Sequence, residues 1–165
     1  MPRKTTITGD GIRDDSLTGD DINELTLILP HFTTHKYTNT SGNTMKLIRF
    51  NAAGSDGTGG NQVNNKFLAP TGGALKMVKI RSDNAMGSTE IALMKISDGN
   101  NNFGDPGMPA ADVTITVASV DTAYEAIFNT GNTFNAGDVL GIRINPTNNH
   151  GNVDLTCVWE LDFSS

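Results

Sequence analysis

The segment VDLTCVWELDF, residues 153–163, decides the fold of this chain. Apolar side chains occupy every second position of it: Val153, Leu155, Cys157, Trp159, Leu161 and Phe163. The positions between them hold Asp154, Thr156, Glu160 and Asp162, with Val158 as the exception. Because successive side chains of a β-strand point to opposite faces, this alternation predicts a strand with one buried and one solvated face, as an antiparallel sheet requires.

Eight more segments carry strand signals, at 25–29, 44–50, 66–69, 75–81, 89–96, 112–118, 123–128 and 139–144. Turn-forming residues, chiefly Gly, Asn, Asp and Pro, fill the linkers at 52–60, 69–73, 97–107, 129–138 and 145–152. Short strands at regular spacing, with no helical pattern between them, predict an all-β fold. We expect an antiparallel β-sandwich, most simply a jelly roll, over residues 25–165.

Two of these strands have a particularly clear pattern. In 112–118 we expect Val113, Ile115 and Val117 on one face and Thr114 and Thr116 on the other. In 139–144, Leu140, Ile142 and Ile144 alternate with Gly141 and Arg143. Glu90, Glu125 and Glu160 fall at predicted outward positions, so no pair of carboxylates can be assigned to glycoside cleavage.

The composition excludes several classes of protein. The net charge is −6 and no basic stripe is present, so nucleic acid is not an expected partner. No run of eighteen apolar residues is present to span a membrane. The single cysteine cannot form an internal disulfide, and the first residues, MPRKTTITGDG, lack the apolar core of a signal peptide. We expect the chain to be made and folded in a cytoplasm.

Residues 1–24 follow a different pattern and form a predicted N-terminal arm. Ile7, Ile12, Leu17 and Ile22 recur at every fifth position, with Gly, Asp, Thr and Ser between them. A period of five suits neither a helix nor a strand, and such a segment cannot offset its own ordering entropy. It is either a flexible tail or a segment whose apolar residues are buried between chains. The regular period favours the second interpretation, with these four residues at the interface.

Metal-ligating and catalytic patterns are weak. His31 and His35 are four residues apart, but in an extended segment that places them roughly 13 Å apart, too far to share an ion. We therefore expect surface histidines. The segment from Asp98 to Asn102 is similar to a calcium loop, but Phe103 replaces the required Gly and Pro109 the required Glu, which favours a polar turn.

The remaining reactive and aromatic residues have structural explanations. Cys157 lies on an apolar strand face without a His–Asn constellation, so we expect a buried structural thiol. Trp159 shares that face and is expected in the core, although a solvent-facing Trp would offer a platform for sugar. Gly59–Gly60 and Gly72–Gly73 lack the Lys of a phosphate loop. We predict no catalytic, cofactor-binding or metal site, and no enzyme.

Three segments of the sequence resemble known virion proteins. The arm, ITGDGIRDDSLTGDDI (7–22), resembles N-terminal segments of fibre-like and decoration proteins of tailed, especially marine, bacteriophages. The stretches NNKFLAPTGGALKMVKIRS (64–82) and FNAGDVLGIRINPTNNHGNVDLTCVWELD (134–162) resemble a virion β-domain similar to trimeric jelly rolls of the tumour-necrosis-factor type. The resemblance implies a trimeric virion protein with an N-terminal anchor and an exposed C-terminal head.

We therefore expect a phage virion structural protein, most simply a trimeric capsid decoration (cement or head-fibre) protein. Its arm would bind the major capsid protein or another virion protein. Two alternatives stay open: a short tail or neck fibre or adhesin that binds host surface glycans, and a stand-alone carbohydrate-binding module. The expected location is the virion, on the capsid exterior or on the tail or neck, after synthesis in the host cytoplasm.

Overall fold

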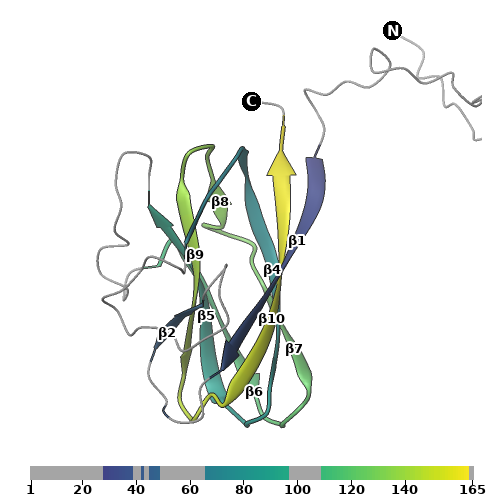
Figure 1. The fold of residues 1–165 in the computed structure, drawn as a ribbon, viewed down its shortest axis with the longest axis vertical. Coiled ribbons are helices and arrows are strands. Elements are labelled where there is room, and N and C mark those ends of the chain that lie inside the picture. Colours follow the sequence, from purple (N-terminus) through teal and green to yellow (C-terminus); the bar gives the residue numbers. More distant parts are fainter. Residues whose placement is uncertain (1–27, 39–41, 43–44, 49–65, 97–108, 164–165) are drawn as a thin grey trace, which may run out of the picture.

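The computed structural model describes residues 28–38, 42, 45–48, 66–96 and 109–163 (Figure 1). These residues form ten strands and no helix: β1 (Ile28–Thr38), β2 (Lys46–Ile48), β3 (Phe67–Leu68), β4 (Gly72–Ser82), β5 (Gly87–Ile96), β6 (Ala111–Val117), β7 (Ala123–Ile127), β8 (Thr133–Phe134), β9 (Val139–Pro146) and β10 (Asn152–Asp162). The predicted all-β fold is confirmed.

The strands form two antiparallel sheets packed face to face. Sheet A has the order β1-β10-β4-β7, with the short β8 paired to β4. Sheet B has the order β2-β9-β5-β6, with the short β3 paired to β9. Without β3 and β8, successive strands alternate between the sheets, except that β5 and β6 pair within sheet B, and this winding is that of a jelly roll.

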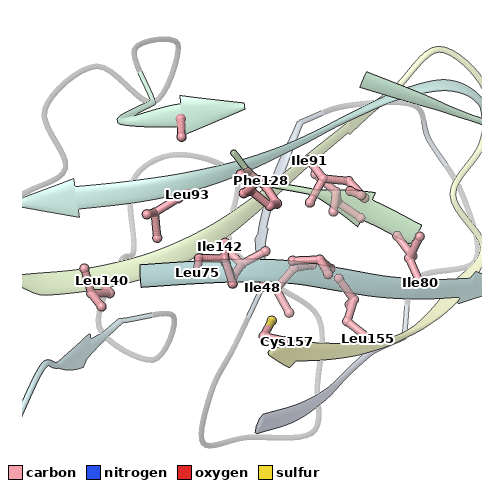
Figure 2. Close-up of a cluster of buried hydrophobic side chains, with 14 of the residues drawn as sticks. Ile48, Leu75, Ile80, Ile91, Leu93, Phe128, Leu140, Ile142, Leu155 and Cys157 are labelled. Atoms are coloured by element: carbon pink, nitrogen blue, oxygen red, sulfur yellow. The ribbon is translucent and has the colours of Figure 1, made fainter. Parts of the chain in front are cut away.

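The core lies between the sheets and is built from alternate residues of each long strand. Val153, Leu155, Cys157 and Trp159 of β10 are all nearly inaccessible to solvent. They lie beside Leu75, Val78 and Ile80 of the neighbouring strand β4, and Leu140, Ile142 and Ile144 of β9 close the core from sheet B. Figure 2 shows how the branched aliphatic side chains of the two sheets meet around Phe128 and Cys157. Burying side chains of this size contributes about 1.5–3 kcal/mol each.

Most predicted strands coincide with observed ones, but two were missed in part or entirely. β1 runs to Thr38, well beyond the predicted segment 25–29, because its inward positions hold Thr33, His35 and Tyr37 and give no apolar alternation. Pro30 is tolerated in β1 because β1 lies at the edge of its sheet. The two-residue β8 lies inside the predicted linker 129–138.

The alternation within strands holds, with two corrections. Thr114 and Thr116 are exposed on β6 as expected. Gly141 and Arg143 are buried rather than solvated, because the outer face of sheet B carries a second apolar cluster. That cluster consists of Leu47, Met94 and Ile96, with Val139 against it. Phe163 follows the end of β10 and is 45% exposed, so it does not extend the buried face.

Several predictions lie outside the described residues. The arm residues Ile7, Ile12, Leu17 and Ile22 belong to this group, as does the boundary between residues 24 and 25. So does the calcium-like segment that begins at Asp98. These predictions stay predictions.

The close approach of β4 to β10 at Gly73 generates a first test. A Cβ atom on Gly73 would collide with the carbonyl oxygen of Glu160 and lie 2.9 Å from the ring of Phe134. We expect Gly73→Ala to lower the free energy of unfolding by about 1–3 kcal/mol, measured by urea denaturation. Gly72→Ala is the matched control, because its nearest contact would be an ordinary 3.6 Å. Equal effects of the two substitutions would contradict the pairing at this position.

Candidate interaction surfaces

The outer face of sheet A carries a continuous row of apolar side chains, which we call the apolar row. The strand register places Phe32 of β1 opposite Val158 of β10, Val158 opposite Met77 of β4, and Met77 opposite Ile127 of β7. The row therefore crosses all four long strands. Phe32 is 60% exposed and Ile127 is 56% exposed, so both ends of the row face solvent.

Charged side chains flank the apolar row on both sides. Lys76 pairs with Glu160 on one side, with 3.1 Å between Nζ and Oε2. Lys79 pairs with Glu125 on the other, with 2.9 Å between Nζ and Oε1. Exposed pairs of this kind contribute little to the stability of the fold. Each flank therefore presents both signs of charge beside an apolar centre.

This arrangement is typical of a protein–protein interface. Scattered exposed apolar residues are normal on a soluble protein, but an apolar centre with a polar rim marks a surface that another protein covers. The row was not predicted, although one signal pointed to it. Val158 is an apolar residue at an outward position of 153–163. Its partner Met77 on β4, and Ile127, the partner of Met77 on β7, are likewise apolar residues at outward positions.

A pocket of about 500 Å³ opens at the side of the sandwich, between β1 of sheet A and β3 of sheet B. Its lining comes from four strands and one loop residue: His31, Thr33, Thr34 and His35 of β1, Phe67 of β3, Pro70, Phe134 of β8, and Trp159 and Leu161 of β10. Phe67 and Phe134 each meet Trp159 edge to face, at centroid distances of 5.2 and 5.8 Å. The pocket is therefore an aromatic extension of the core, and its volume lies in the range of ligand sites.

The polar groups in the pocket bind one another. The indole Nε1–H of Trp159 donates to the hydroxyl of Thr33 over 2.8 Å. The same hydroxyl lies 2.9 Å from Nε2 of His35. Because buried polar groups with partners have little to gain from a polar ligand, the inner part of the pocket presents mainly apolar surface.

The histidines differ from the prediction of surface positions. His31 is exposed, but His35 is only 7% exposed, and its ring is held by Thr33. His150, at the end of the β9–β10 connection, is fully buried and stacks edge to face on Tyr37. His31 and His35 lie four residues apart on the extended β1. Among the described residues, no three metal-ligating side chains gather.

The ionisable groups inside the sandwich are structural. Cys157 is fully buried, and desolvation raises the pKa of its thiol to about 12, against a weaker lowering by the hydrogen bond to Thr33. Burial lowers the pKa of the Arg143 guanidinium, which forms an ion pair with Glu90 at the rim of the outer cluster. Trp159 is 1% exposed, so it fills the core as predicted and offers no platform for sugar stacking.

Comparison with known proteins gives no family for this chain. The chain matches no protein-family model, and no curated protein matches it significantly. Within the described part of the chain, no helix has the length and apolar character required to cross a membrane.

The raised pKa of Cys157 predicts an alkaline instability. Above pH 9, the ordinary value, the unfolded chain releases the thiol proton, while the folded chain keeps it until about pH 12. The free energy of unfolding therefore falls as pH rises through this window. Between pH 8 and pH 10 we expect the native chain to lose about 1 kcal/mol more than Cys157→Ala, measured by urea denaturation.

The comparison with Cys157→Ala isolates the contribution of the thiol from that of every other group. Parallel pH profiles of the two proteins would contradict a buried, protonated Cys157. A second readout is maleimide labelling at pH 7, which should proceed only after unfolding because the thiolate is the reactive form.

Proposed function

We propose that this protein is a non-catalytic assembly protein whose copies pack through the outer face of sheet A. More specifically, we propose a structural protein of a bacteriophage virion, a trimeric decoration protein on the capsid. The observation that carries the proposal is the apolar row. Phe32 and Ile127 project into solvent from opposite edges of one sheet, and covering them contributes about 1.5–3 kcal/mol each.

A second copy is the occupant that fits this face best. Each flank of the row presents both a Lys and a Glu, so a second copy can place opposite charges beside a shared apolar centre. Opposite charges also lie side by side beyond the Lys79–Glu125 pair, where Lys36 pairs with Asp154 and Arg81 pairs with Asp121. The trimeric state itself comes from the resemblance to trimeric jelly rolls.

The virion context rests on two further supports. Jelly rolls are the recurrent building block of viral shells, although lectins and cupins share the architecture. The N-terminal arm is the second support. Its apolar residues would anchor the trimer to the major capsid protein or another virion protein: Ile7, Ile12, Leu17 and Ile22. The sandwich would then project from the particle.

A short tail or neck fibre is the alternative that the same interface would serve. It differs in copy number and in binding host glycans through its loops. A stand-alone carbohydrate-binding module is less well supported, because the single Trp is inaccessible in the core.

The interface is tested with Phe32→Thr combined with Ile127→Thr in the full chain. Thr keeps the strand propensity and removes apolar surface. We expect the native chain to sediment as a multiple of 17.5 kDa. The double variant should raise the dissociation constant at least a hundredfold, because each of the two lost contacts is worth at least about 1.4 kcal/mol, which is a factor of ten. Sedimentation equilibrium measures the mass of the native oligomer and the dissociation constants of the native chain and the variant.

The matched control removes two exposed apolar side chains that lie off this face, Leu68→Thr with Val120→Thr. It should assemble as the native chain does. A native chain that stays monomeric at tens of micromolar would contradict the proposal, as would a double variant that assembles unchanged. Far-ultraviolet circular dichroism verifies that all variants are folded.

The location is tested by quantitative mass spectrometry of purified particles, with the major capsid protein as reference. Hundreds of copies per particle are expected of a decoration protein, because it follows the capsid lattice. A few tens of copies or fewer would contradict decoration and support the tail or neck fibre.

A further inference from the structure

The aromatic pocket lies beside the edge of β1 that pairs with no described strand, and the interface proposed above uses neither. β1 pairs only with β10, so no described strand lies on its other side. The pocket opens beside that edge, where His31 and Thr33 face into the sandwich. An extended segment that added to this edge would direct alternate side chains into the pocket.

We propose that the pocket takes up an apolar side chain from the N-terminal arm of a neighbouring copy, while the arm backbone adds to the edge of β1. This inference rests on the proposed self-assembly, since it needs a second copy. The arm would then have a binding site on another copy of this chain, in addition to any contact with the capsid.

The pocket selects an apolar occupant. Phe67, Phe134 and Leu161 line it, and Trp159 closes its floor. The indole N–H and the Thr33 hydroxyl are already paired. A polar ligand would lose water without gaining these partners, whereas an Ile or Leu side chain would extend the core.

The arm can offer one apolar side chain at a time, because a period of five places successive apolar residues on opposite sides of an extended chain. Its apolar residues are five positions apart and are separated by small polar residues. One side chain can therefore enter the pocket while its flanking residues stay along the rim. Of the four, Leu17 and Ile22 are nearest to β1 in the sequence. An exposed edge strand is also a surface that natural proteins cover, which strand addition would achieve.

Chain geometry favours a neighbouring copy over the same copy. The arm joins β1 through residues 23–27, so it could fill its own pocket only by reversing direction within this short segment, whereas a neighbouring copy can be reached without a reversal. Leu17 lies eleven residues before Ile28, where β1 begins, so the extended chain between them spans up to about 36 Å, which is about the length of the eleven-residue β1 itself. The arm is thus long enough to cross to another sandwich.

The experiment uses the full chain with Asp21→Cys, labelled with a benzophenone maleimide. Cys157 is buried, so the label goes to position 21. Copies grown in ¹⁴N and ¹⁵N are mixed, assembled and irradiated, and the crosslinked peptides are identified by mass spectrometry. We expect crosslinks from position 21 to peptides that contain 31–35 or 67–70, in mixed-isotope pairs.

Two variants test the contact itself. Ile22→Asp combined with Leu17→Asp should reduce these crosslinks at least fivefold, and so should His31→Trp, which fills the mouth of the pocket. Thr38→Trp, on the same strand but outside the pocket, should leave them unchanged.

The outcomes separate the two proposals. Assembly without crosslinks to the pocket would overturn this inference and leave the apolar row intact. Crosslinks found only between peptides of the same isotope would contradict insertion into a neighbouring copy, because the arm would then fill the pocket of its own chain. A monomeric chain, without mixed pairs, would overturn both proposals.

Discussion

The structure depends on the double pairing of β10. This eleven-residue strand is hydrogen-bonded to β1 on one side and to β4 on the other, so it is the strand through which β1 joins the rest of sheet A. Its inner face supplies Cys157 and Trp159 to the core, and its outer face places Val158 in the apolar row. A shift of one residue would exchange the two faces. The bulge between Val158 and Trp159 is where the register to β4 changes.

The fold was predictable because alternation is a local signal. The segments 75–81, 112–118 and 153–163 each pair a buried face with a more exposed one, and the observed strands differ from them by a few residues at most. The signal failed where the inner face is polar or the outer face is covered. β1 turns Thr33 and His35 inward. On β9, both faces are buried around Arg143, so the expected solvated face does not exist.

The candidate surfaces were not predictable because they are properties of register. Phe32 and Ile127 are 95 positions apart in the sequence, and only three successive strand pairings align them. Each looked like an isolated exception to a pattern. The pocket likewise joins Phe67, Phe134 and Trp159, which belong to three strands in two sheets. Sequence alternation assigns a residue to a face but does not say which neighbours share that face.

The two proposed contacts are linked through β1. Phe32 lies on the outer face of this edge strand, while His31 and Thr33 face the pocket on the other side. An edge strand with one hydrogen-bonded partner is the least constrained strand of a sheet. Covering Phe32 orders β1 from outside, and an arm added to its free edge orders it from the side. Whichever contact forms first orders β1, so the second contact forms with a smaller loss of conformational entropy. The two contacts therefore favour each other. Assembly through both would be cooperative, with few half-assembled forms between the free chain and the complete oligomer.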